Sequence, residues 1–138
     1  MDTAQVDLWN ERSGEVVGAI ISPQWDGGTV RLTIEAPDVD LALQADGPDL
    51  FAALQQLRRS LELLGWVPLC NGARVDCYPS GMARDMGGGA SVYVLSAKPG
   101  LHRRLPLVGT FDPAPKESVG TVEDQDEYFR RWLGSRRR

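Results

Sequence analysis

Apolar residues alternate with polar ones through most of the first 47 positions, a pattern that predicts short strands. Four segments are predicted as strands: residues 6–9, 16–21, 30–35 and 39–44. The segment 16–21 is a nearly continuous apolar run, which indicates burial on both faces, and Pro23 is expected to end it. Because the connections are too short for parallel crossovers, we expect an antiparallel meander.

Five leucines at helical spacing predict the next element, an α-helix over residues 48–64. Their steps of 4, 3, 4 and 3 line one face: Leu50, Leu54, Leu57, Leu61 and Leu64. Asp46 or Gly47 is expected to cap its start, and Gly65 to take the left-handed conformation after its last turn. A partner-binding helix is the alternative, but the flanking strands favour packing against a sheet.

A second hairpin is predicted around Asn71-Gly72, the residue pair most typical of a two-residue turn. The expected pairs are Cys70 with Ala73, Pro68 with Val75, and Trp66 with Cys77. The two cysteines are then about four strand positions apart, near 13 Å at ~3.3 Å per residue. A disulfide needs its α-carbons within roughly 7 Å, so we expect two buried, reduced thiols.

The rest of the chain predicts two short strands and a terminal helix. One strand is expected over residues 91–95, another between 98 and 110, and a loop over 111–118. Thr121 and Asp124 resemble a capping pair, and three apolar side chains are expected to dock the helix: Phe129, Trp132 and Leu133. The elements predict a single α+β domain over residues 1–138, with an antiparallel sheet of six to seven strands, one long leucine-faced helix packed on it, and a C-terminal helix.

Residues 79–89 contain four glycines, two methionines and the pair Arg84-Asp85, and they are predicted as a loop between two strands. One interpretation is a protein-binding loop, in which Met82 and Met86 supply adaptable apolar contact and Arg84 an anchoring charge. In a purely structural interpretation the methionines lie under the sheet, Arg84 pairs with a carboxylate such as Asp76, and the glycines allow a tight connection.

Two chemical interpretations of the same loop are weaker. A phosphate-binding loop needs a following helix and a Gly-Lys-Ser/Thr ending, and neither is expected here. A nucleophilic site at Ser80 or Cys77 needs a nearby base, and the surroundings offer only Asp76, Arg84 and Asp85. The chain has one histidine, His102, and two cysteines, which limits metal sites and acid–base catalysis near neutral pH. We therefore expect no catalytic residues, no metal and no cofactor.

Charge is unevenly distributed along the chain. Residues 1–65 hold 11 acidic and 4 basic side chains, and residues 66–138 hold 8 and 11. An acidic body disfavours nucleic-acid binding and suits a basic protein partner, although acidity also serves solubility alone. The acidic residues that we expect to steer such a partner are Asp26, Glu35, Asp38 and Asp40. Without a long apolar run or a secretory signal, we expect a cytoplasmic protein with no membrane contact.

The segments Leu64–Asp76 and Pro79–Gly89, together with Thr121–Gln125, resemble small standalone bacterial proteins of polymorphic toxin and contact-dependent competition loci. The similarity covers roughly residues 60–97 and 119–134. In those loci the small protein acts as an immunity protein, so the resemblance implies a cognate toxin, often a nuclease or deaminase. It brings no residue-level binding role with it.

The favoured function is therefore an immunity-type protein that neutralises a toxin by direct protein–protein contact, with an interface drawn from the four acidic residues and Met82, Arg84, Asp85 and Met86. The alternative is a small enzyme or ligand-binding protein that uses the loop 79–89 with Arg74, Asp76, Arg84 and Asp85. A pocket that converges on those four side chains would favour the alternative.

Overall fold

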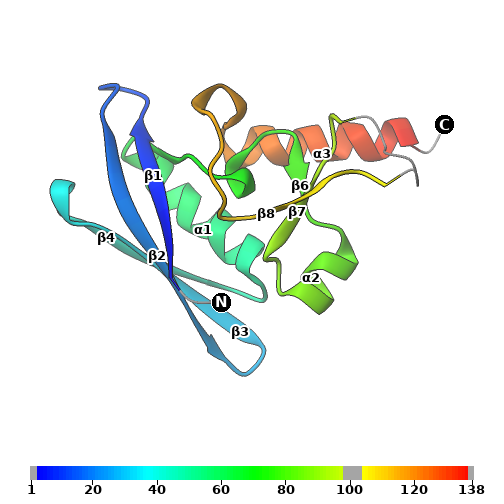
Figure 1. Cartoon of the computed structure of the whole chain (residues 1–138), viewed down its shortest axis with the longest axis horizontal. Helices are drawn as coiled ribbons and strands as arrows, with labels where there is room; N and C mark the ends of the chain where they lie inside the picture. Colours follow the sequence, from blue (N-terminus) through cyan, green and yellow to red (C-terminus); the bar gives the residue numbers. More distant parts are fainter. Residues whose placement is uncertain (1–2, 98–103, 137–138) are drawn as a thin grey trace.

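The computed structural model describes residues 3–97 and 104–136, which form two antiparallel sheets and three α-helices (Figure 1). The larger sheet contains β1 (Ala4–Asn10), β2 (Val16–Asp26), β3 (Thr29–Ala36), β4 (Leu41–Gly47) and β5 (Trp66–Pro68). The smaller sheet contains β6 (Cys77–Tyr78), β7 (Ser91–Val94) and β8 (Leu107–Gly109). The helices are α1 (Leu50–Leu63), α2 (Gly81–Gly87) and α3 (Val122–Arg136). The α+β class is confirmed, but one sheet of six to seven strands is wrong, because the described strands divide into sheets of five and three.

The larger sheet has the order β4-β3-β2-β1-β5, so the predicted meander is confirmed and β5 joins its far edge after α1. Buried side chains alternate with more exposed ones along β1, β3 and the first half of β2, and the buried set belongs to the core shared with α1: Val6, Leu8, Val17, Ala19, Ile21, Val30, Leu32, Ile34 and Ala36. The prediction that residues 16–21 are buried on both faces is therefore wrong. Val16 and Ile20 lie exposed on the face opposite α1.

Pro23 lies inside β2 and does not end it, since the strand continues to Asp26. The pairing of β1 with β2 stops at Ile21, so beyond that residue β3 is the only neighbour of β2 among the described strands. A proline is compatible with such an edge because its missing N–H takes no bond from the ladder. The proline alone predicted that the strand ends at residue 23. The strand is longer because its pairing with β3 continues to Asp26.

Helix α1 packs its leucines into the main core, as predicted. Leu50, Leu54, Leu57 and Leu61 are all buried, whereas Leu64 follows the helix and is exposed. Neither Asp46 nor Gly47 caps the helix, since both belong to β4. The cap is Asp49, whose Oδ1 accepts a hydrogen bond from Ala52 N at 2.8 Å. Gly65 has φ +83° and takes the left-handed position, as expected.

The predicted hairpin around Asn71-Gly72 does not form. Trp66 pairs with Asn10 of β1, β6 pairs with β7, and residues 71–73 make a 3₁₀ turn. Gly72 is required for close packing rather than for a positive φ, because a Cβ there would lie 2.6 Å from Leu54 Cδ2. Tertiary packing has therefore overridden a strong local turn preference.

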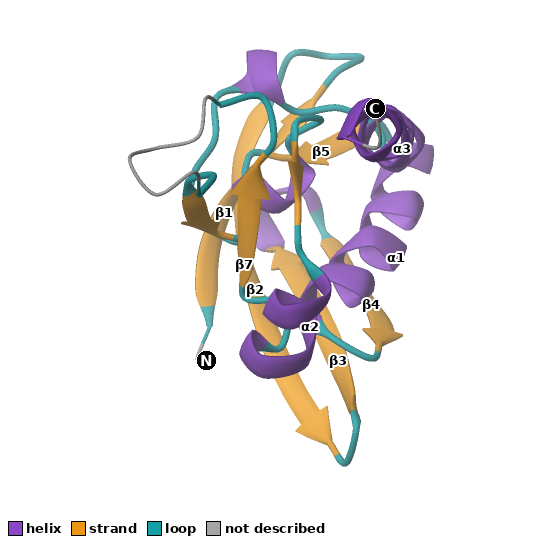
Figure 2. Ribbon diagram, turned by 90° about the vertical axis from the view of Figure 1, so that its right-hand side faces the viewer, coloured by secondary structure: helices purple, strands orange, loops and turns teal. Residues whose placement is uncertain are grey.

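Both cysteines are buried free thiols, as predicted, and they lie in different cores. Cys70 belongs to the large core between the five-stranded sheet and α1. Cys77 belongs to a small core of four buried residues: Phe51, Cys77, Val92 and Val94. Figure 2 shows α2 at the lower end of β7, and in Figure 1 α2 and α3 lie on the opposite side of the molecule from the β3–β4 connection. No helix in the described ranges is long and apolar enough to cross a membrane.

Candidate partner-binding site

The four acidic residues expected to steer a partner do not form one patch. Asp26 lies at the β2–β3 hairpin, where it pairs with Thr29. Glu35, Asp38 and Asp40 are exposed at the other end of β3, in or beside its connection to β4. The six positions from Thr29 to Glu35 span about 20 Å at ~3.3 Å per residue. We call Glu35, Asp38 and Asp40 the acidic end.

Residues 79–89, predicted as a loop, contain the two-turn helix α2. Ser80 Oγ accepts a hydrogen bond from Ala83 N at 3.1 Å, and Gly88, with φ +63°, ends the helix in the left-handed conformation. The glycines lie at the ends of α2, and the five residues between them are compatible with helix. Glycine content alone therefore predicted the wrong element.

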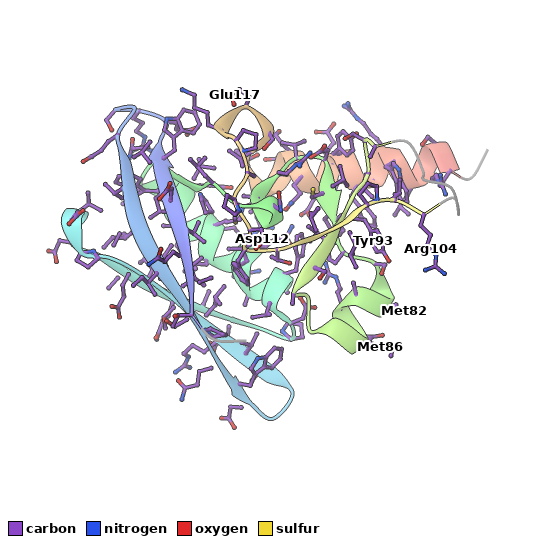
Figure 3. All side chains as sticks on the ribbon, viewed as in Figure 1. Met82, Met86, Tyr93, Arg104, Asp112 and Glu117 are labelled. Atoms are coloured by element: carbon purple, nitrogen blue, oxygen red, sulfur yellow. The ribbon has the colours of Figure 1, made fainter. Side chains whose placement is uncertain are left out.

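The exposed side of α2 carries Met82 and Met86, which are 71% and 82% exposed (Figure 3). They are four residues apart and so share one helix face. At the C-terminal end of α2, a Cβ on Gly88 would lie 3.2 Å from the Trp25 indole, which is itself 46% exposed. The structural interpretation in which both methionines lie under the sheet is thus wrong. We call Trp25, Met82 and Met86 the apolar patch.

Arg84 lies on the inner side of α2 and holds the helix against the body. Its Nη1 is 3.6 Å from Asp49 Oδ2, and its guanidinium lies 5.2 Å from the Phe51 ring centroid and 5.6 Å from that of Tyr78. Asp49 also caps α1, so one carboxylate joins α1 to α2. Arg84 pairs with Asp49 rather than with the expected Asp76. Asp85 is exposed on α2.

Asp76 instead forms a bidentate pair with Arg74, with distances of 2.9 and 2.8 Å. Burial on its own would raise the pKa of Asp76, but hydrogen bonds from Arg74 and Ser96 outweigh it and lower that pKa. Burial raises the pKa of the neighbouring Cys77 thiol to about 12, so the thiol is protonated at neutral pH. The four residues of the enzyme alternative therefore do not form one group. Arg74 pairs with Asp76, whereas Arg84 pairs with Asp49.

A groove of about 430 Å³ lies beside α2, between the smaller sheet and α3. Its apolar lining comes from the smaller sheet (Tyr78 of β6, Tyr93 of β7 and Leu95 just after β7), from α2 (Met82) and from α3 (Phe129 and Trp132). Arg104 and Arg136 line it as well. In Figure 3, Met82, Tyr93 and Arg104 lie at the same end of the molecule. We call this cavity the aromatic groove.

Stacked rings form one wall of the aromatic groove. Tyr78 and Phe129 stack with centroids 3.9 Å apart and planes 6° from parallel, and Trp132 follows Phe129 at 6.2 Å. The Tyr78 hydroxyl donates to Asp126 Oδ1 at 3.0 Å, and Phe51 contacts the Tyr78 ring edge at 5.0 Å. The rings are therefore fixed by the small core below them and by α3.

Helix α3 is anchored by a buried polar network. Arg58 of α1 donates to Gly72 O, Gly120 O and Gln125 Oε1 at 2.6–3.1 Å, and Gln125 Nε2 donates to Gly72 O, Arg74 O and Cys77 O at 2.8–3.1 Å. The expected cap forms, with Thr121 Oγ1 accepting from the N–H of Asp124 at 3.0 Å.

The sequence pattern predicted Phe129 and Trp132 as docking residues of α3 but gave no role to Gln125, which is buried. The available signal was its position one helical turn before Phe129, on the same face. The sequence also did not predict that Tyr78 stacks on Phe129 or that Tyr93 lines the aromatic groove.

His102 falls outside the described residues, as do Arg137 and Arg138. In the described part of the chain, no group of three or more His, Cys, Asp or Glu side chains is placed to hold a metal ion. Comparison with known protein families and with curated proteins finds no match to this chain. The arrangement offers contact chemistry: exposed apolar side chains on a small helix, a preformed aromatic groove, and two arginines at that groove.

Proposed function

We propose that the chain is an immunity-type protein that binds and neutralises a cognate bacterial toxin in the cytoplasm by direct protein–protein contact. The observation that best supports binding is the apolar patch beside the aromatic groove. Trp and Met are enriched in protein interfaces, and Met adapts its shape to a partner. That the partner is a toxin is inferred from the sequence resemblance.

The acidic end supplies a second, electrostatic contribution to this proposal. Three carboxylates on a protein with net charge −4 raise the association rate of a basic partner. A nuclease- or deaminase-like toxin, which handles a polyanion, is a partner of that charge. The apolar patch and groove then supply most of the binding energy, because desolvated apolar contacts outweigh exposed charges at an interface.

The alternative, a ligand-binding protein or small enzyme, has one supporting observation. The aromatic groove falls within the roughly 300–1,000 Å³ typical of small-molecule sites. The residues first considered for it, Arg74, Asp76, Arg84 and Asp85, do not converge there, since none of them lines the groove.

The test is capture of the partner from cells that encode the chain, followed by a growth assay. The tagged chain is compared with the double variant Met82→Glu/Met86→Glu and with Leu63→Glu, which alters an equally exposed apolar residue, 78% exposed, at the end of α1. We expect the wild type and Leu63→Glu to retain one protein that stops growth when produced alone. The chain should restore growth, and the methionine variant should not. Absence of any growth-inhibiting partner would refute the proposal.

A further inference from the structure

The aromatic groove carries a positive charge on an otherwise acidic chain. Arg104 and Arg136 line it, and among the residues that the structure describes no Asp or Glu does. Neither guanidinium forms an ion pair with a carboxylate of the described residues. Arg136 lies instead over the Trp132 ring, 5.1 Å from its centroid. The groove and the acidic end thus present opposite charges.

The wall of the groove is preformed. The stack of Tyr78 on Phe129 is fixed by the hydrogen bond to Asp126 and by the edge contact with Phe51. A large apolar side chain that enters the groove therefore meets rings that need no reordering, which lowers the entropic cost of binding. Met82 lines the groove and is also part of the apolar patch, so the apolar surface continues onto α2.

From these observations we infer that the groove binds an extended acidic segment of the partner protein. A large apolar side chain of that segment fills the aromatic groove, and its carboxylates pair with Arg104 and Arg136, as arginine forks do with carboxylates. The inference rests on the proposed function in one respect, that the chain acts by binding a protein. A toxin with a basic body and an acidic segment would use the acidic end and the groove together.

Two features favour a peptide over single-stranded nucleic acid. Sequence-tolerant nucleic-acid sites need free ring faces for bases, and here Tyr78 and Phe129 stack on each other, so one face of each ring is already covered. A polyanion would also meet the first turns of α3, which carry Glu123, Asp124, Asp126 and Glu127. A short segment with two or three carboxylates interacts mainly with groups within the Debye length of about 8 Å.

The experiment pans a random seven-residue peptide library on the purified full chain and measures the enriched peptides by fluorescence anisotropy. We expect enrichment of sequences that combine Trp, Phe or Leu with two or more Asp or Glu residues. Binding should weaken at least tenfold in Arg104→Glu/Arg136→Glu. The matched control, Lys116→Glu/Arg130→Glu, makes the same change in net charge at exposed residues outside the groove and should weaken binding less than threefold. Circular dichroism is used to check that both variants fold.

Three results would overturn the inference: no enrichment, enrichment of basic peptides, or equal losses in the two variants. Tighter binding of fluorescein-labelled octauridylate than of the enriched peptides, lost in Arg104→Glu/Arg136→Glu, would replace the peptide by nucleic acid. Failure of the inference is distinct from failure of the proposed function. If the captured toxin is neutralised equally well by Arg104→Glu/Arg136→Glu, only the groove assignment falls. If acidic peptides bind the groove but no toxin is neutralised, only the immunity function falls.

Discussion

The sheet half and the groove half of the molecule are built differently. The strands β1 to β4 and α1 enclose one large apolar core, and along most of these strands buried side chains alternate with more exposed ones. The groove half has two- to four-residue strands, a core of four buried residues, and a helix held by the buried pair Arg58 and Gln125. Of the two candidate contact surfaces, the acidic end lies on the sheet half. The aromatic groove, which has the larger apolar surface, lies on the half that depends most on buried hydrogen bonds.

The largest expected effect is on stability, in Arg58→Met. The methionine fills part of the same space but leaves Gly120 O without its donor and removes one donor from Gly72 O and Gln125 Oε1. Hydrogen bonds from a charged donor contribute about 1.5–3 kcal/mol each. Burial of the guanidinium costs free energy that the methionine does not, so we expect a net loss of about 3 kcal/mol in the free energy of unfolding rather than the sum of the three bonds. Urea denaturation at pH 7 measures it. The control Arg59→Met alters the next, exposed residue and should change stability by less than about 0.5 kcal/mol. Equal effects would show that the network does not hold α3.

Alkaline pH should destabilise the protein through its buried thiols. Burial raises the pKa of Cys70 from 9.0 to about 11. Between these values the native chain holds a proton that the unfolded chain has lost, so stability is complete below pH 9 and falls as the pH rises toward 11. The loss between pH 8 and 11 should be about 2 kcal/mol smaller in Cys70→Ala than in the wild type. Denaturation at a series of pH values tests this, and parallel curves for the two proteins would contradict it.

The two cysteines also report separately on the two halves. Cys70 lies in the large core and Cys77 in the small one, and regions with fewer buried contacts open more readily. We expect iodoacetamide at pH 8 to label Cys77 about tenfold faster than Cys70 in the same native molecules, a difference of about 1.4 kcal/mol in opening free energy. Peptide mapping by mass spectrometry gives both rates. Identical rates would mean that both thiols react only after global unfolding.

The sequence predicted the sheet half of the molecule better than the groove half. In β1 to β4 and α1, one layer packs on another, so local periodicity decides which side chains are buried. Between Trp66 and Gly89, local preferences were overridden: Asn71-Gly72 serves close packing, and the glycine-rich stretch forms α2.

Of the candidate site, Met82 and Met86 were proposed from their residue types and position, whereas Arg84, proposed with them, pairs with Asp49 on the inner side of α2. The aromatic groove was not, because Tyr78 and Phe129 come from β6 and α3 and are stacked only through the tertiary fold. No spacing rule relates side chains that are 51 positions apart in the chain.

The smallest expected effect concerns steering by the acidic end. Glu35→Lys/Asp38→Lys should lower the association rate of the captured basic partner severalfold at low ionic strength and leave its dissociation rate almost unchanged, because exposed charges act mainly before contact. Asp40 is left intact because its φ of +54° makes substitution a backbone change as well.

The matched control for steering is Glu11→Lys/Glu117→Lys, which makes the same change in net charge at exposed positions elsewhere. Stopped-flow kinetics in low and high salt separate the two variants, since screening at 1 M reduces the Debye length to about 3 Å. A groove variant, Arg104→Glu/Arg136→Glu, should show the opposite signature, with faster dissociation at any salt concentration. If the acidic-end variant instead changes the dissociation rate, or if its control slows association equally, the acidic end does not act by steering the partner.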